Sequence, residues 1–238
     1  MLRKALITTL LLPFAVNAAP LSMDLDSLVH GEIVTDQFAG VTVTGDNPNR
    51  DFDHIIAFDT NMSNTRDDDL ESPWSGGNLP TDTDMGKILI FAENDNGAED
   101  NVIDTPDDEG SRQYDLTMSF QFDFDLKSFS FVLVDVEGPE EYGYFASFYN
   151  GDTLIETVGF EELVGNTGPY GSNAVFGNNT INRINPITAE QLGMDFNRVD
   201  VVFGGSGGIG DISYEVPAPA MIGLFSLALI AVGFVRRK

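Results

Sequence analysis

The segment 114–125 constrains the fold more than any other part of the chain, because apolar and polar residues alternate along its whole length. Its apolar residues occupy every second position: Leu116, Met118, Phe120, Phe122 and Phe124. In a β-strand, side chains two positions apart share a face, whereas successive residues of an α-helix are rotated by about 100°, which mixes odd and even positions. The alternation therefore predicts a β-strand with one face in a core.

Short apolar runs separated by turn residues recur through the rest of the chain. The sequence contains 24 Gly, 11 Pro and 18 Phe, which is typical of a β-rich protein with many turns. Further strands are predicted at 40–44, 54–58, 87–91, 128–137, 144–149, 153–160, 199–203 and 210–214. The run 87–91 is apolar enough to be buried on both faces, and 188–192 is predicted as a single helical turn. We expect an all-β fold, a β-sandwich of the jelly-roll type.

The N-terminus has the features of a secretory signal peptide. Arg3 and Lys4 precede an apolar stretch at 5–16, and small residues before and at Ala18 are typical of a signal-peptidase site. We therefore predict a signal peptide at 1–18 that signal peptidase removes during export.

The C-terminus has the features of a membrane anchor. Residues 218–235 carry no charge and are followed by Arg236, Arg237 and Lys238. A helix of this length spans roughly 27 Å at about 1.5 Å per residue, close to the hydrocarbon thickness of a bilayer. The basic end predicts that the terminus stays in the cytoplasm while everything upstream is exported. A buried C-terminal helix is the alternative, although such a helix rarely lacks polar residues on every side.

A short proline motif comes directly before this helix: Val216, Pro217, Ala218 and Pro219. Motif, apolar helix and basic end together resemble the PEP-CTERM sorting signal of Gram-negative bacteria, which an exosortase reads. The resemblance covers residues 216–238, with Ala218 in place of the Glu that gives the motif its name. It implies sorting to the cell surface or extracellular matrix with cleavage near the motif.

The part between the two signals, 19–215, is strongly acidic. It holds all 38 Asp and Glu residues of the chain but only seven of the twelve Lys and Arg. Such a charge repels a phosphate backbone, which excludes nucleic acid as a partner. The carboxylates must either be spread over a solvated surface or be neutralised by bound cations. No cysteine is present, so no disulfide stabilises the exported domain.

Side chains that could bind a metal ion through oxygen are abundant in the sequence, whereas those that bind through nitrogen or sulfur are scarce or absent. Oxygen ligands suit calcium. Asp67, Asp68 and Asp69 are consecutive in a predicted loop, where unpaired like charges repel one another. Other loop carboxylates are Asp59, Glu93, Asp95, Asp107, Asp108 and Glu109. Because the loops at one end of a sandwich converge, these residues can share an ion. A solvated acidic surface is the alternative.

Two further patterns resemble a known kind of domain. Residues 119–137 contain Phe-X-Phe-Asp and then Ser-Phe-X-Leu-Val-Asp-Val-Glu, and residues 199–214 combine an apolar strand with Gly-Gly-Ser-Gly-Gly. They are similar to the uncharacterised sandwich domains found ahead of PEP-CTERM tails, which resemble galactose-binding-like and carbohydrate-binding jelly rolls. The resemblance implies a structural calcium ligand at Asp211 and binding of a sugar.

Aromatic residues in loops are the candidates for stacking on a sugar ring. Trp74, the sole tryptophan, lies in Ser-Pro-Trp-Ser-Gly-Gly, where we expect an exposed side chain. Tyr142, Tyr144 and Tyr170 are the other loop aromatics. Packing over the end of the core is the alternative for each of them.

Catalytic motifs are weak. His30 and His54 are the only imidazoles, too few for a zinc site or a triad, and Ser206 lies in a glycine-rich turn without the helix of a nucleophile elbow. We expect no catalytic residue and no enzyme, but a calcium-stabilised structural or binding protein of the bacterial envelope or matrix. One alternative is a calcium-dependent carbohydrate-binding module for exopolysaccharide. The other is a hydrolase that uses paired carboxylates.

Overall fold

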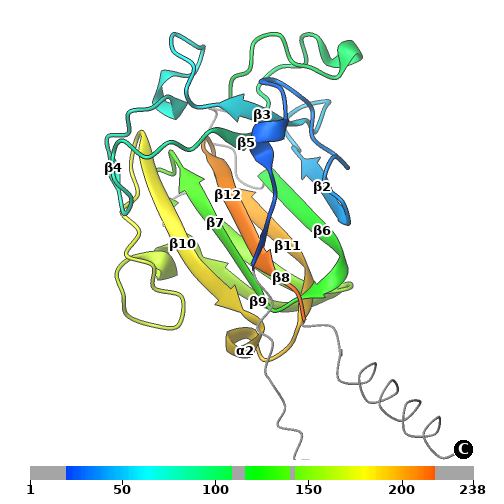
Figure 1. Ribbon diagram of the computed structural model, residues 1–238, viewed down its shortest axis with the longest axis vertical. Coiled ribbons are helices and arrows are strands. Elements are labelled where there is room, and N and C mark those ends of the chain that lie inside the picture. Colours follow the sequence, from blue (N-terminus) through cyan, green and yellow to red (C-terminus); the bar gives the residue numbers. More distant parts are fainter. Residues whose placement is uncertain (1–19, 109–115, 140–142, 218–238) are drawn as a thin grey trace, which may run out of the picture. The chain divides into compact units, whose positions relative to one another are not determined.

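The apolar segments form two sheets that enclose the main core between them (Figure 1). The computed structural model describes residues 20–108, 116–139 and 143–217. The first sheet has the strand order β3-β5-β12-β7-β10-β4, with β1 paired to β12, and the second has the order β2-β6-β11-β8-β9. Neighbouring strands are antiparallel, except that β4 and β10 are parallel. The described chain is therefore an all-β sandwich.

Most of the longer strands follow the predicted segments with a few shifts in their bounds. The first sheet contains β1 (Leu21–Ser22), β3 (Ile55–Asp59), β4 (Gly76–Gly77), β5 (Lys87–Phe91), β7 (Ser128–Val134), β10 (Thr180–Thr188) and β12 (Gly208–Glu215). The second contains β2 (Val41–Asp46), β6 (Leu116–Leu126), β8 (Phe145–Asn150), β9 (Thr153–Gly159) and β11 (Phe196–Phe203). The short helices are η1 (Leu25–Ser27), η2 (Asp68–Leu70), η3 (Ala98–Asp100), η4 (Phe160–Leu163) and α2 (Ala189–Leu192).

Strand β6 confirms the alternation in the sequence. Phe120 and Phe122 are at most 1% exposed, and their rings lie 5.9 and 6.1 Å from that of Phe129 in the first sheet. Gln121 lies on the opposite, outer face. Phe124 departs from the pattern and is only partly buried, at the point where the register with β11 shifts. One face of this strand thus lies in the main core, as the sequence predicts.

A second apolar cluster covers the outer face of the first sheet. Ile88 and Ile90 of β5 belong to this cluster, while Leu89 and Phe91 belong to the main core. Strand β7 is buried along its whole length in the same way. The prediction that 87–91 is buried on both faces is confirmed, because the connecting segments after β3 fold back over the sheet.

Strand β10 is absent from the sequence-based prediction. Polar Asn185 and then Pro186 interrupt its apolar residues, so no periodicity of two is visible. In the structure, the register with β7 shifts between Ile184 and Ile187, which places the proline in an irregularity of the ladder. The helical turn predicted just after this strand is confirmed as α2, whose N-cap Thr188 forms a capping box.

The predicted signal peptide at 1–18 and the predicted membrane span at 218–235 lie outside the described residues. Within the described part of the chain, no helix is long and apolar enough to cross a bilayer.

Candidate functional site

Four carboxylates from distant parts of the sequence meet at one edge of the first sheet, and we call them the carboxylate cluster: Asp67, Asp69, Asp108 and Asp135. Asp135 directly follows β7, and Asp108 forms an isolated bridge with Ala92, which directly follows β5. Because β12 is antiparallel to both β5 and β7, those two strands end at the same edge. The segment of η2 brings in Asp67 and Asp69.

The glycine-rich turn between β11 and β12 closes over two of these carboxylates. The backbone N–H of Gly207 donates to Oδ2 of Asp108 at 2.6 Å, and Oγ of Ser206 donates to Oδ2 of Asp135 at 3.2 Å. Gly207 has a φ of 127°, and a Cβ there would lie 3.0 Å from the carbonyl oxygen of Val134. The turn therefore requires glycine at this position. The sequence-based interpretation of Ser206 as part of a glycine-rich turn agrees with this arrangement.

Two consecutive asparagines before β10 tie the cluster together from the other side. The backbone N–H of Asn179 donates to Oδ1 of Asp135 at 2.5 Å, and its Nδ2 donates to the carbonyl oxygen of Asp69 at 2.9 Å. The side chain of Asn178 donates to Oδ2 of Asp69 at 3.0 Å. Asp135 and Asn179 both adopt left-handed conformations, with φ of 55° and 51°. Such strained positions persist when surrounding contacts hold them, and they are frequent at functional sites.

Burial shifts the acid–base equilibria of three members of the cluster. Asp67 and Asp108 are each 6% exposed and Asp135 is 1% exposed. Burial, with the neighbouring Asp69 and Asp108, raises the pKa of Asp67 to about 10. Burial raises the pKa of Asp108 to about 7 against the hydrogen bond from Gly207. Burial likewise raises the pKa of Asp135 to about 8, with Asp69 and Asp108 adding to the effect.

At neutral pH the negative charge of these buried carboxylates must therefore be neutralised. Either protons bind to the carboxylates, or a cation binds among them. Among the described residues, no group of three or more Asp, Glu or His side chains has the arrangement that would hold a metal ion. Occupation by a cation would require side chains of the cluster to turn from the positions that they have here.

The other predicted calcium ligands have partners of their own, are exposed, or lie outside the described residues. Asp107 pairs with Arg66 at 3.0 Å, and Glu93 lies 3.6 Å from Arg50. Asp59 accepts the backbone N–H of Asn61. Asp68 and Asp95 are exposed, and Glu109 lies outside the described residues. Three of the predicted ligands, Asp67, Asp69 and Asp108, are thus brought together.

Asp135 is the member that the sequence-based prediction missed. It directly follows the continuously apolar strand β7, so the prediction assigned it to the strand 128–137. A carboxylate at the end of a strand buried on both faces is the signal that could have identified it, because an acidic residue is rarely buried without a partner.

Two of the candidate sugar-stacking residues are buried, so the expected exposure of Trp74 is wrong and Tyr144 follows the alternative of packing over the core. Trp74 is 3% exposed, belongs to the apolar cluster over the first sheet, and donates from Nε1 to the carbonyl oxygen of Thr83 at 2.9 Å. Tyr144 is also 3% exposed and donates to the carbonyl oxygen of Ser206 at 3.1 Å. Both rings pack on apolar residues, which leaves no face for a sugar. Tyr142 lies outside the described residues.

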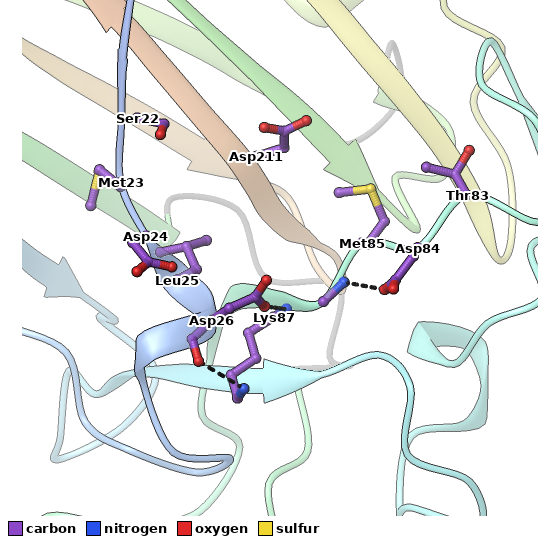
Figure 2. A pocket seen from close by; sticks show the side chains of 11 residues that line it. Ser22, Met23, Asp24, Leu25, Asp26, Thr83, Asp84, Met85, Lys87 and Asp211 are labelled. Atoms are coloured by element: carbon purple, nitrogen blue, oxygen red, sulfur yellow. Dashed lines mark hydrogen bonds between the residues drawn. The ribbon is translucent and has the colours of Figure 1, made fainter.

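Asp211 lines a separate open cavity of about 600 Å³, shown in Figure 2. Asp24, Asp26 and Asp84 surround the same cavity, together with Lys87. Several of these groups already have protein partners. Oδ1 of Asp26 accepts the backbone N–H of Lys87 at 3.0 Å, and Asp84 accepts that of Gly86 at 3.0 Å.

Asp211 itself forms an ion pair with Arg183. The guanidinium already compensates this carboxylate, so Asp211 does not depend on a metal ion for its counter-charge. Its φ of 42° is left-handed, at the point where the register of β12 with β7 shifts.

The two histidines have structural surroundings. Nδ1 of His30 accepts the backbone N–H of Asp59 at 3.0 Å, and burial lowers the pKa of this imidazole. The ring of His54 stacks on that of Phe52.

Comparisons of the chain with protein families, with curated proteins and with solved structures found no match.

Proposed function

We propose that this chain is an exported, surface-sorted β-sandwich with a structural or binding role in the envelope or extracellular matrix of a Gram-negative bacterium. The support is the pair of terminal signals: a signal peptide at 1–18, and the Val216–Pro219 motif followed by an apolar helix and a basic end. Signal peptidase and an exosortase are the processing partners, and the helix at 218–235 is the membrane contact before sorting.

We propose that a calcium ion stabilises the exported domain at the carboxylate cluster. The observation that carries this proposal is the convergence of four carboxylates from segments far apart in sequence, three of them nearly buried. A divalent cation would replace the protons that the raised pKa values otherwise require. Carboxylate and backbone carbonyl oxygens are the ligands that calcium prefers, and its coordination is tolerant of irregular geometry.

We also propose that the sandwich is a jelly roll, on the basis of its strand order. The run β5-β12-β7-β10 in one sheet and the run β6-β11-β8-β9 in the other follow the order of two interleaved Greek keys. Strands β2 and β3 extend the two sheets at the edge where β6 and β5 lie.

The calcium proposal is tested by thermal unfolding of the purified protein with excess calcium or with a chelator. For a site of micromolar affinity, millimolar calcium should add about 4 kcal/mol of stability, which raises the melting temperature by many degrees. Magnesium serves as the control for ionic strength and divalent charge. A calcium shift below about one degree would rule out a stabilising site.

A glycan hydrolase is less well supported than a binding role. Within the described part of the chain, a general acid with the raised pKa that it requires is offered by Asp67, Asp108 and Asp135, and these residues are at most 6% exposed. A glycosidic bond could not reach them without opening the loops. Turnover on a panel of glycans would favour the hydrolase.

A further inference from the structure

Strand β9 forms one edge of the second sheet, and its outer side is open. It is the last strand in the order β2-β6-β11-β8-β9, where β8 is its neighbour. Within the described ranges, no other backbone segment forms a bridge to it. An unpaired strand edge offers a row of N–H and C=O groups to which a further strand can bind.

The other long strands at sheet edges are covered by the chain itself. In β2, the backbone N–H of Val43 donates to the carbonyl oxygen of Thr35 at 2.6 Å. In β3, the backbone N–H of Ala57 donates to the carbonyl oxygen of Glu32 at 3.0 Å. Strands β1 and β4 have only two residues each, whereas β9 has seven. Among the described strands, β9 is therefore the long one whose edge is left open.

The hydrogen bonds to β8 show which groups of β9 point outward. The backbone N–H of Phe160, directly after the strand, donates to the carbonyl oxygen of Tyr144 at 3.0 Å. In an antiparallel pair such bonds recur at every second residue, so the N–H of Val158 also faces β8. The N–H groups of Thr157 and Gly159 therefore face away from the sheet.

Glutamate side chains hold both of these outward donors. The N–H of Thr157 donates to Oε1 of Glu156 at 3.2 Å, and that of Gly159 donates to Oε1 of Glu162 at 3.1 Å. The carbonyl oxygens of an added strand can replace the two carboxylates as acceptors. The displaced carboxylates would then lie beside the added strand, where they repel acidic side chains and pair with Lys or Arg. The local hydrogen bonds therefore favour a basic segment.

A hollow of about 400 Å³ opens where β9 leads into η4. Gly159 lines it together with Phe145, Glu161 and Glu162. The carboxylate of Glu161 lies where a Cβ of Gly159 would be. The partly buried ring of Phe145 offers an apolar surface for the methylene groups of a Lys or Arg side chain, whose charged end can then reach the two exposed carboxylates.

We propose that the outer edge of β9 binds an extended, basic segment of another protein, which adds a strand to the second sheet. Backbone hydrogen bonds to Thr157 and Gly159 form the pairing, and Lys or Arg side chains contact Glu156, Glu161 and Glu162. The proposal names a partner for the proposed binding role and so rests on it, but it does not involve the carboxylate cluster.

Charge argues against a second copy of the chain as the partner. The chain has a formal net charge of −26, so two copies repel each other. Pairing of β9 with β9 of a second copy would also bring two sets of the same glutamates together. The charge of Glu156 and the register shift between Phe148 and Tyr149 are features that limit unspecific pairing of edge strands.

The proposal is tested by fluorescence anisotropy of three labelled octapeptides with the full-length protein. Alternating Lys and Val give a peptide that can form a strand and carries the complementary charge. Alternating Lys and Pro keep the charge but remove the N–H groups of every second residue, and alternating Glu and Val reverse the charge. The Lys-Val peptide should bind at least tenfold more tightly than either of the others.

Variants of Thr157 test the backbone pairing. Thr157→Pro removes the outward N–H but leaves the bonds to β8 in place, because this N–H does not face β8. It should weaken binding of the Lys-Val peptide tenfold or more. Thr157→Val is the matched control, since it keeps the N–H and loses only the hydroxyl group that bonds to Ser147. It should bind within about twofold of the wild type.

Substitutions of single glutamates test the charge. Glu161→Gln should weaken binding of the Lys-Val peptide about two- to fivefold, as expected for loss of one exposed ion pair. Glu190→Gln, which removes an exposed charge from α2, is the matched control and should leave binding unchanged.

No binding of the Lys-Val peptide, or equal binding of the Lys-Pro or Glu-Val peptide, would overturn the proposal. So would unchanged binding by folded Thr157→Pro; if this variant does not fold, the comparison of the three peptides decides alone. A dimer that Thr157→Pro dissociates in sedimentation velocity would assign the edge to contact between copies of the chain instead. The calcium shift in melting temperature should persist in Thr157→Pro, so that failure at this edge and failure of the calcium site are distinguished.

Discussion

The backbone N–H of Gly207 donates a 2.6 Å hydrogen bond to Oδ2 of Asp108, although the two residues are 99 positions apart in the sequence. This bond connects the last turn of the sandwich to the loop that follows β5. It joins a backbone donor to a carboxylate that is 6% exposed, where hydrogen bonds are strong and an unpaired charge is costly. The stability of the loops at this end of the first sheet therefore depends on whether protons or a cation neutralise the carboxylate cluster.

Without calcium, stability should fall as the pH rises through the neutral range. The pKa of Asp135 is raised from 3.8 to about 8, so between these values the folded state holds a proton that the unfolded state has released. One such group lowers the free energy of unfolding by up to about 1.4 kcal/mol per pH unit over this window. Urea titrations in chelator at several pH values measure the slope, and Asp135→Asn should reduce it. An equal slope in the variant would contradict the raised pKa.

The stabilisation by calcium should itself grow as the pH rises. Calcium binds ionised carboxylates, so protons compete with it and its affinity rises with pH. The increase in melting temperature on adding calcium should therefore be larger at pH 8 than at pH 5. Differential scanning calorimetry with calcium and with chelator at both pH values measures this. A shift that is independent of pH would place the bound ion away from the carboxylate cluster.

Asp108→Asn should have opposite effects in the two conditions. In chelator at pH 8 the variant should be at least as stable as the wild type, because the neutral amide can keep the hydrogen bond from Gly207 without a buried charge. In calcium it should lose most of the metal-dependent shift. Asp211→Asn is the control outside the cluster, and its calcium shift should equal that of the wild type. Destabilisation of Asp108→Asn by the same amount in both conditions would argue for a role in packing alone.

Neighbouring residues of β6 should differ sharply in their contribution to stability. Phe122→Ala should cost about 3–5 kcal/mol, because this ring is 1% exposed and packs between the sheets. Gln121→Ala should cost about 1 kcal/mol, through loss of the bonds from Nε2 to the carbonyl oxygens of Phe122 and Asn197. Urea titrations of the two variants measure the contrast. Equal losses would contradict the assigned faces of the strand.

Local patterns in the sequence predict these two strands well. The alternation at 114–125 indicates a strand with one buried face, and the continuous apolar run at 87–91 indicates a strand with both faces buried. Local patterns fail for Trp74. A loop rich in Ser, Pro and Gly indicates an exposed side chain only where the loop does not pack on another part of the protein. Here that loop lies on the first sheet and encloses a second apolar cluster. The carboxylate cluster is predictable only in part for the same reason. Asp67 and Asp69 are two positions apart in the sequence, whereas Asp135 joins them only through the topology of the sheet.

The sole tryptophan offers an independent test of that second apolar layer. Trp74 is 3% exposed and its Nε1 donates to Thr83, so its fluorescence should be blue-shifted and poorly quenched by iodide in the native state. Quenching of Trp74 by iodide to the same extent in the native and the unfolded state would contradict the burial of this ring against the first sheet.

The last prediction concerns cleavage at the two ends of the chain during export and sorting. If 1–18 is a signal peptide, mass spectrometry of the native protein should find Ala19 at its N-terminus. If the motif Val216–Pro219 is cut, the surface form should lack the apolar helix and the basic end, while a strain without exosortase should retain them. Replacing Pro217 and Pro219 by Ala tests whether the motif itself is read, since the helix and its cations remain in that variant. Recovery of an intact Lys238 terminus from the surface fraction of the wild type would leave export and membrane anchoring in place and exclude processing. Because Ala218 occupies the position where the motif's name has Glu, the ratio of cut to uncut protein measures how strongly the exosortase depends on that residue.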